Sequence, residues 1–247
     1  MISIEKFIED TNAAETPEDV FDLFLSALRE CGYDRVCYSL ITDHPSLDLK
    51  AGHGIFQNYP GDWMTYYMSK GYQCVDPVPK HCFNTIRPFT WDALDQARPM
   101  SKSENLVMNE AHEAKLLSGA AIPLHGPNGE LAGVGLASSA GQAECDPVTL
   151  AKIQAISFQF HIAYTDQNKK RPSLKGVVIL TSREKEILQW AAEGKSDYVI
   201  ADIIGVSYPT IRFHMNNIFR KLQANDRILA VVKAIRLGLI LPTYVMK

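Results

Sequence analysis

This 247-residue chain contains a run of helix-capping signals between residues 180 and 222, which restricts its fold more than any other pattern in the sequence. The sequence TSRE at 181–184 has the spacing in which a hydroxyl and a carboxylate reciprocally cap the free amides at a helix N-terminus. Gly194 can close that helix in a left-handed conformation. The pattern therefore predicts one helix from about residue 182 to residue 193.

Two further helices are predicted after Gly194. Ser196 can cap a short helix and Ser207 a longer one, and Gly205 between them lets the chain reverse direction. The short helix is predicted to bury Ile200, Ile203 and Ile204. Two helices joined by a tight glycine turn are typical of a helix-turn-helix.

The longer helix has two different faces. Its apolar residues recur at spacings of four, three and four, and they predict a buried stripe of Ile211, Met215, Ile218 and Leu222. The opposite face carries side chains that suit base edges in a DNA major groove, namely Arg212, Phe213, Asn216 and Arg220. Ser207 and Thr210 at its N-terminus can hold a backbone phosphate. The alternative is a solvated amphipathic helix whose Phe213 is one more core aromatic.

This stretch resembles the DNA-binding domain of the LuxR family, whose pattern is LTxREKEVLxW, then IA, then TVxxHxxxIxxKL. Ile211 stands where valine is usual in the family, and Tyr208-Pro209 departs from the usual start of the recognition helix. The resemblance therefore implies a helix-turn-helix that binds double-stranded DNA, but it implies no base preference.

Length and composition set the wider limits. The chain suits one large or two medium domains, and its 46% hydrophobic content is enough for packed cores. No apolar run reaches the ~18 residues of a membrane span, and residues 1–5 lack a basic signal-peptide start, so we expect a cytoplasmic protein without membrane contacts. Five cysteines without a C-x-x-C pair, and histidines without metal-site spacing, predict no disulfide framework, no metal and no cofactor.

Charge divides the chain into two parts. From Val177 onward there are 10 Lys and Arg residues against 6 Asp and Glu residues, which gives a net charge of +4. Residues 1–176 contain 15 Lys and Arg against 22 Asp and Glu, which gives a net charge of −7. Only the C-terminal part has the sign that favours phosphate contacts. Residues 167–176 are polar, contain Pro and Gly and show no periodicity, which is typical of a linker. We therefore predict a domain at 1–166, a linker at 167–176 and a DNA-binding domain at 177–247.

The N-terminal part mixes helical and strand patterns. Helices are predicted at 3–12, 17–32, 61–71, 101–117 and 147–165, with short elements near 76–83, and strands at 35–41, 51–56, 119–124 and 131–138. Asn128-Gly129 is a strong hairpin signal between the last two strands. The predicted fold class is α+β: an N-terminal α/β/α sandwich on a mainly antiparallel sheet, followed by an all-α, four-helix helix-turn-helix domain.

The stretch from residue 59 to residue 91 concentrates polar aromatic side chains beside one carboxylate. Trp63 and Tyr67 lie one turn apart on a predicted helix, so they share a face. If that face turns inward, their polar groups and the carboxylate of Asp76 meet in an apolar interior, where each unpaired neutral group costs roughly 1–3 kcal/mol. A ligand with an amide and a second carbonyl could satisfy them. The alternative is that the aromatics are ordinary core and that Asp76 caps a helix begun by Pro77.

With these residues the resemblance extends through the whole chain. The pattern YPxxWxxxY, then DP, then PFxW, is similar to the autoinducer-binding domain of LuxR-type quorum-sensing receptors. The family's signature positions are filled by Trp63, Tyr67, Asp76, Pro77, Trp91 and Gly119, and those of its DNA-binding domain by Glu184, Leu188 and Gly194. Two further features most resemble the LasR and QscR branch of the family. The first is the motif GYxxxDP with His81-Cys82 after it, and the second is the motif PLHGxxGEL.

The resemblance implies an N-acyl-homoserine lactone as the ligand. Trp63 would bond the lactone carbonyl, and Trp91 would pack on the lactone ring. Asp76 would accept the amide N–H, and Tyr67 would donate its hydroxyl to the amide carbonyl. Tyr59 is the first residue of the YPxxWxxxY motif and is a further candidate for a ligand contact.

The strand at 131–138 bears on the acyl chain of the ligand. Its alternate residues Gly133, Gly135 and Ala137 are small and leave room if that face lines the pocket, which favours a medium or long acyl chain. The alternative is that the glycines only permit close strand–helix packing. In LasR-like receptors a hydroxyl residue on this strand helps to position the signal. Gly135 stands near that position and lacks the hydroxyl, so the resemblance does not imply recognition of a 3-oxo group, although Ser39 or a water could substitute.

The expected function is ligand-responsive transcription regulation. A bound lactone would stabilise the first domain, and the protein would dimerise through the helix at 147–165. A second apolar contact would come from the helix at 227–237, through Ile228, Val231, Val232 and Ile235. The dimer would read an inverted-repeat operator and control quorum-sensing genes, with RNA polymerase as a further partner.

Three other classes of function are alternatives to this one. A LuxR-type solo regulator would respond to a non-cognate or non-lactone small molecule. An enzyme acting on the lactone would use Asp76 as a base and Cys74 or Cys82 as a nucleophile, but no histidine stands in a recognisable relation to either cysteine. A phosphorylated response regulator would need acidic residues at the ends of parallel strands, a pattern that this sequence does not show. We therefore predict a regulator and not an enzyme.

Overall fold

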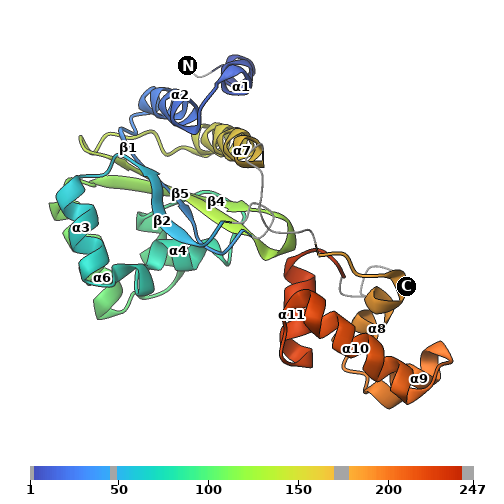
Figure 1. Cartoon of the computed structure of the whole chain (residues 1–247). Helices are drawn as coiled ribbons and strands as arrows, with labels where there is room; N and C mark the ends of the chain where they lie inside the picture. Colours follow the sequence, from blue (N-terminus) through green and yellow to red (C-terminus); the bar gives the residue numbers. More distant parts are fainter. Residues whose placement is uncertain (1–2, 45–48, 170–177, 241–247) are drawn as a thin grey trace. The chain divides into compact units, whose positions relative to one another are not determined.

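The computed structural model describes residues 3–44, 49–169 and 178–240. The chain divides into two compact units, the first containing helices α1 to α7 and the second containing α8 to α11 (Figure 1). In the described ranges, no helix is both long enough and apolar enough to span a membrane.

The first unit is built on a five-stranded sheet in the order β2-β1-β5-β4-β3. The strands are β1 Arg35–Leu40, β2 Gly52–Gln57, β3 Phe89–Thr90, β4 Ser118–His125 and β5 Leu131–Ser138. Every pairing between them is antiparallel, with β1 and β5 adjacent at the centre. The sheet therefore confirms the predicted antiparallel, α+β architecture.

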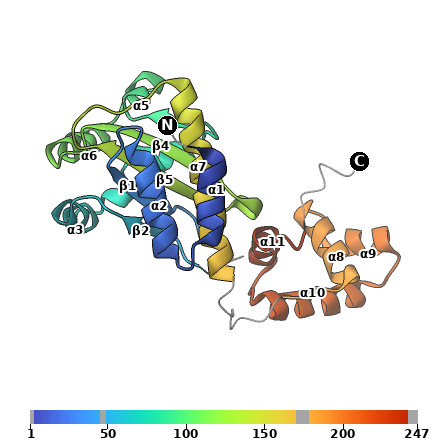
Figure 2. The same ribbon diagram turned by 90° about the horizontal axis from the view of Figure 1, so that it is seen from above.

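Three helices cover one face of the sheet and pack side by side (Figure 2): α1 Ile4–Ala13, α2 Pro17–Arg29 and α7 Pro147–Lys169. Thr16 begins α2 through a reciprocal capping box with Asp19. Phe24 of α2 and Phe160 of α7 stack with ring centroids 4.5 Å apart, and both are fully buried. This face holds the largest apolar cluster of the unit.

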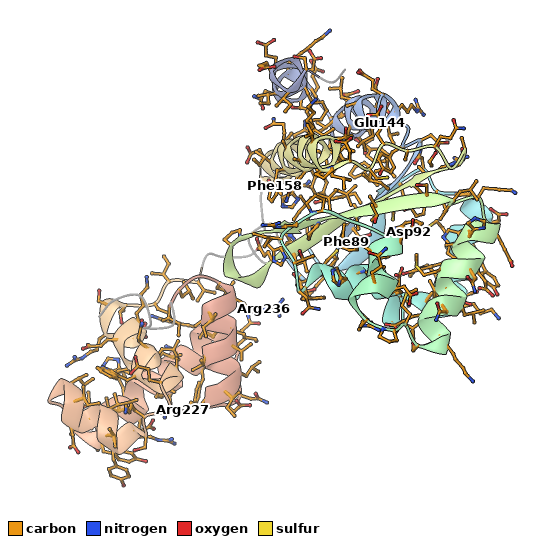
Figure 3. All side chains as sticks on the ribbon, turned by 180° about the vertical axis from the view of Figure 1, so that it is seen from behind. Phe89, Asp92, Glu144, Phe158, Arg227 and Arg236 are labelled. Atoms are coloured by element: carbon orange, nitrogen blue, oxygen red, sulfur yellow. The ribbon has the colours of Figure 1, made fainter. Side chains whose placement is uncertain are left out.

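The opposite face is covered by short helices: α3 Gly61–Ser69, the 3-10 turn η2 Tyr72–Cys74, α4 Pro77–Cys82, α5 Asp92–Ala97 and α6 Lys102–Glu113 (Figure 1). Phe158 of α7 packs with the cluster on the first face, whereas Phe89 of β3 belongs to a cluster on the second (Figure 3). Helices thus cover both faces, which confirms the α/β/α sandwich. The second face carries the predicted ligand residues.

The described part of the second unit consists of four helices: α8 Ser182–Ala192, α9 Asp197–Ile204, α10 Tyr208–Leu222 and α11 Arg227–Arg236. Gly205 ends α9 with φ +68°, as the predicted turn requires. The predicted stripe of α10 is buried, with Ile211 and Ile218 fully inaccessible. One expectation is wrong: Ile203 is 44% exposed, because the inward side of the short α9 is formed by Ile200 and Ala201.

Several element boundaries differ from those predicted. Helix α6 ends at Glu113 rather than residue 117, because Lys115 adopts a left-handed conformation with φ +66°. Helix α7 continues to Lys169, into the predicted linker at 167–176, whose remaining residues lie outside the described ranges. The hairpin signal at Asn128-Gly129 falls in a 3-10 turn, η3 Pro127–Gly129. Strand β3 and helix α5 were not predicted.

The start of α8 contains a buried ionic contact that can be tested. Glu184 accepts hydrogen bonds from Thr181 N and from Lys221 Nζ, each at 2.7 Å. Burial opposes its ionisation, but the hydrogen bonds from Lys221 and Thr181 hold the pKa of Glu184 below its usual range. Because the pKa of Glu184 is lowered, its ionised carboxylate stabilises the folded state at pH values above the ordinary glutamate pKa. This contribution to folding stability is lost as the pH falls through the lowered pKa.

We expect Glu184→Gln to lower the unfolding free energy of the second unit by about 1–3 kcal/mol, because Lys221 loses its anionic partner. Amide hydrogen exchange of α8 to α11 in the full-length protein measures this loss. The matched control is Glu186→Gln in the same helix, whose surface pair with Arg183 should contribute less than about 0.5 kcal/mol. Equal losses in the two variants would contradict the prediction.

Candidate functional site

The polar aromatic residues predicted from the sequence converge on one pocket, which is lined by residues of the sheet and of helices α3, α4 and α6. Its cavity measures about 70 Å³. The predicted residues that line it are Ser39, Tyr59, Trp63, Tyr67, Asp76, Trp91 and Gly135. Pro77 and Gly119 do not line the cavity. Pro77 is the first residue of α4, and Gly119 lies against the ring of Trp91.

Asp76 caps α4, as one of the two interpretations of the sequence predicted, and its carboxylate also contacts Tyr67. One of its carboxylate oxygens, Oδ1, caps α4 by accepting the Val78 amide at 2.8 Å, and the other, Oδ2, accepts the Tyr67 hydroxyl at 2.8 Å. Burial raises the pKa of the Asp76 carboxyl, while the Val78 and Tyr67 hydrogen bonds act in the opposite direction. Because the carboxylate remains disfavoured by burial, one more N–H donor at this point would stabilise it.

Trp91 forms a wall of the pocket by packing directly onto strand β4. A Cβ atom placed at Gly119 would lie 2.1 Å from the indole ring, so this position must be glycine if the ring is to lie there. The Trp91 amide also donates to Gly119 O at 2.9 Å. Among the residues that the structure describes, Trp91 Nε1 is buried without an acceptor. A buried unpaired N–H is costly unless a ligand satisfies it.

The glycines of β5 face the pocket, as the sequence suggested, but the space beside them is filled. A Cβ atom at Gly133 would lie 2.9 Å from Ile41 Cδ1, and one at Gly135 would lie 3.0 Å from the Tyr59 hydroxyl. Ile41 and Tyr59 come from segments that follow β1 and β2, and a Cβ atom at Gly133 would also lie 3.8 Å from Cys82 Sγ at the end of α4. Ala137, the third small residue, lies in the apolar cluster of Trp63.

The sequence did not reveal that His53 and Cys37 belong to this pocket. His53 of β2 stacks on Tyr67, with ring centroids 4.7 Å apart and planes 11° apart. Its ring nitrogens face Ser39 Oγ at 3.3 Å and Cys37 Sγ at 3.9 Å. The only sequence signal for a place of Cys37 in the pocket was the strand alternation that puts Cys37 and Ser39 on the same face. The pairing of β1 with β2, which brings His53 to them, could not be predicted.

The chemistry of these thiols does not support nucleophilic catalysis. Burial raises the pKa of Cys37 to about 12 and that of Cys82 to about 12, so both thiols are protonated at neutral pH. Burial lowers the pKa of His53, so this imidazole is neutral. Cys74 is exposed. The pocket therefore offers neutral hydrogen-bonding groups around one carboxyl.

In the second unit, the four predicted base contacts of α10 are all exposed. Phe213 is 63% exposed, so the alternative that placed it in the core is wrong. Ser207 caps α10 through the Thr210 amide, and the two hydroxyls lie 2.8 Å apart. Arg212 forms an ion pair with Asp197 of α9 at 3.8 Å. This face of α10 therefore presents cationic, amide and aromatic groups to solvent.

A pocket of this kind in one unit, and an exposed recognition helix in a helix-turn-helix in the other, define a DNA-binding protein with a small-molecule-binding domain. Residues 16–164 match the family described as autoinducer binding domain, and residues 178–234 match the family of bacterial regulatory proteins of luxR type. The chain belongs to the LuxR family of quorum-sensing transcriptional regulators. It is a regulator and not an enzyme.

Named relatives span nearly the whole chain. The quorum sensing-dependent transcriptional regulator RpaR of Rhodopseudomonas palustris is 31% identical over 239 residues, covering 95% of this chain and 93% of RpaR. The transcriptional activator SolR of Ralstonia solanacearum is 32% identical over 247 residues, covering 95% of this chain and 98% of SolR.

Solved structures share the fold. The crystal structure of Escherichia coli SdiA is similar with a TM-score of 0.74 and 24% identity, covering 96% of this chain and 98% of that one. SdiA in complex with octanoyl-rac-glycerol gives a TM-score of 0.71 at 23% identity, covering 96% and 94%. These likenesses confirm the two-domain architecture.

Proposed function

We propose that this regulator binds an N-acyl-homoserine lactone in the pocket of its first unit. Binding stabilises that unit, the protein dimerises, and the dimer binds an inverted-repeat operator. The observation that carries the proposal is the buried hydrogen bond between Tyr67 and Asp76, in a pocket that Trp63 and Trp91 also line. An acyl-homoserine lactone has one amide N–H, one amide carbonyl and the carbonyl of the lactone ring, and these groups complement the carboxylate, hydroxyl and indole N–H groups of the pocket.

Each polar group of the lactone head has a proposed partner. The amide N–H is donated to Asp76, whose raised carboxyl pKa leaves it in need of a donor. The Tyr67 hydroxyl turns from Asp76 to the amide carbonyl. The Trp63 indole N–H bonds the lactone carbonyl, and Trp91 packs on the lactone ring.

The acyl chain is proposed to run toward Gly133 and Gly135 of β5. Pockets for small ligands occupy roughly 300–1,000 Å³, well above the present cavity, so Ile41 and Tyr59 must move aside. A medium or long chain would take the space that they leave. Entry of the chain would thus replace side chains that now fill the pocket, which couples ligand binding to the packing of the domain.

The response to the ligand is proposed to be a gain in folding free energy. A ligand present at a hundredfold excess over its Kd contributes about 2.7 kcal/mol, a large fraction of the stability of a domain. Apolar residues are exposed where dimer contacts are proposed, with Val148 64% and Ile162 49% exposed on α7. On α11, Ile228 is 77% exposed and Val232 is 46% exposed, whereas Val231 and Ile235 pack against their own core.

The test is the melting temperature of the full-length protein with acyl-homoserine lactones of graded chain length and 3-substitution. We expect a rise that depends on chain length and is greatest for medium or long chains. Light scattering on the same samples should show a dimer with the stabilising lactone. A soluble protein that binds DNA alone and gains no stability from any lactone would refute the assignment.

A second ligand class follows from one comparison. The structure of SdiA that shares this fold holds octanoyl-rac-glycerol, an acyl ester without an amide. In this chain a glycerol hydroxyl could donate to Asp76 in place of the amide N–H. The same melting experiment with octanoylglycerol separates the two classes: a larger rise than with any lactone would identify a regulator of the non-lactone type.

His53 and Ser39 predict discrimination among acyl substituents. Their neutral donors and acceptors lie on the strand side of the pocket, where a 3-oxo or 3-hydroxyl group of the acyl chain can reach them. We expect 3-substituted lactones to bind more tightly than unsubstituted ones of equal length. His53→Phe, which retains the stack on Tyr67, should reduce this preference by about tenfold, the value of one hydrogen bond.

Isothermal titration with matched lactone pairs measures that preference. The control is Cys37→Ala, which removes the weaker partner of His53 and should leave most of the preference intact. An unchanged ratio of affinities in His53→Phe would contradict the prediction.

A further inference from the structure

Two tyrosines, one exposed and one partly buried, stack at the junction of α9 and α10. Tyr198 is the second residue of α9, and Tyr208 is the first residue of α10. Their ring centroids lie 4.1 Å apart and their planes differ by 7°. Tyr198 is nonetheless 65% exposed. The pair is therefore a rigid aromatic surface that neither the ligand pocket nor the predicted base contacts include.

Tyr208 is partly buried and begins the row of α10 residues that carries the predicted base contacts. Residues four apart on a helix stand one above another, and Tyr208, Arg212, Asn216 and Arg220 follow one another at this spacing. Arg212, Asn216 and Arg220 are all exposed, on the side away from the buried stripe. Tyr208 thus occupies the N-terminal end of the row that carries the predicted base contacts.

Tyr198 extends this row onto the neighbouring helix. In a helix-turn-helix the second helix enters the major groove while the first crosses the sugar-phosphate backbone. Helix α9 is that first helix, and it packs against α10 (Figure 2). An aromatic side chain at its N-terminal end, stacked on the start of α10, therefore lies where the groove edge and its phosphates must pass.

The charges near the pair are compatible with a phosphate. Asp197, next to Tyr198, would repel a phosphate, but its carboxylate is paired with Arg212 and with Arg227. The second unit as a whole carries a positive balance. Stacking covers the apolar ring faces against each other, and the phenolic O–H groups remain as polar ends. Tyrosine hydroxyls are among the side-chain groups that contact DNA phosphates.

We propose that the stacked Tyr198–Tyr208 pair is a backbone clamp. The two hydroxyls donate hydrogen bonds to phosphate oxygens at the edge of the major groove, and the rigid stack sets how α10 enters the groove. Because phosphates carry no sequence information, the pair contributes affinity to every DNA site alike.

Phenylalanine variants separate this role from simple packing, because they keep the rings and their stack. We expect Tyr198→Phe and Tyr208→Phe each to weaken binding of a fluorescent duplex of random sequence by about tenfold, as loss of a hydrogen bond to a charged group does. An operator selected from a random pool should lose affinity by the same factor. The salt dependence should be unchanged, since a neutral hydroxyl releases no counterion.

The full-length protein is used throughout, with melting temperature as a check on folding and Tyr66→Phe, an exposed tyrosine of the first unit, as the control. Unchanged affinity with unchanged stability would overturn the proposal, because the pair would only join α9 to α10. A loss confined to the selected operator would also overturn it, since the tyrosines would then read a base.

A chemical change on the DNA gives an independent measurement. Replacing single phosphates by uncharged methylphosphonates should weaken binding of the wild-type protein at specific linkages. At those linkages the penalty should shrink in the phenylalanine variants, because the hydroxyl that made the contact is gone. Equal penalties in wild-type and variant proteins at every linkage would overturn the proposal even if the variants proved unstable.

Discussion

Asp76→Ala is expected to abolish the stabilisation of this protein by acyl-homoserine lactones. The substitution removes the acceptor of the amide N–H, so the ligand would bury that donor unpaired. At a hundredfold excess of ligand over Kd, the wild-type protein should gain about 2.7 kcal/mol, and the variant should gain almost nothing. The apo variant should itself lose about 1–3 kcal/mol, because Tyr67 loses its acceptor and α4 its cap.

Thermal unfolding with and without lactone gives both quantities in one experiment. Asp92→Ala is the matched control, because Asp92 is an exposed acid in the first turn of α5, outside the pocket lining. It should retain the full response to ligand. A lactone-dependent rise in melting temperature that survives in Asp76→Ala would rule out the proposed amide contact, whatever the stability of the apo variant.

Gly119→Ala is expected to destabilise the first unit by about 3 kcal/mol, although it adds only a methyl group. The new Cβ atom would lie within 2.1 to 2.4 Å of three atoms of the Trp91 ring, so the ring must leave its place against β4. The pocket then loses a wall, and the response to lactone should fall with the stability. Urea denaturation of the apo protein measures the loss directly.

A double-mutant cycle identifies the cause of that loss. In a Trp91→Ala background the clash is absent, so Gly119→Ala should cost less than about 1 kcal/mol there. Gly61→Ala is the control for adding a methyl group, because a Cβ at Gly61 would meet no atom within 4 Å. If Gly119→Ala costs as much without the Trp91 ring as with it, the glycine serves the strand backbone and not the ring.

The helix-turn-helix could be predicted almost completely because its signals are local. The capping box of α8, the left-handed Gly205 and the buried stripe of α10 each depend on residues within one or two helical turns. The error at Ile203 shows the limit of such patterns. Which side of a two-turn helix faces inward depends on the helices that it packs against, and apolar periodicity over eight residues does not decide it.

The candidate pocket was predicted only in part. Trp63, Tyr67 and Asp76 lie close together in sequence, on one helix and at the start of another, so their meeting could be expected. His53 and Cys37 were missed because they reach the pocket through the pairing of β1 with β2. The register of that pairing includes a shift between Tyr38 and Leu40, which no alternation of residues predicts.

The two-part organisation, the order of most helices and strands, and the polar groups of the pocket can be predicted from the amino-acid sequence. These follow from capping residues, residue periodicity and composition, which act over short stretches of chain. In contrast, the packing of Ile41 and Tyr59 beside the β5 glycines, and the stack of Tyr198 on Tyr208, are visible only in the folded structure. Such contacts join segments whose relative position is set by the packing of the whole domain, and no local pattern encodes it.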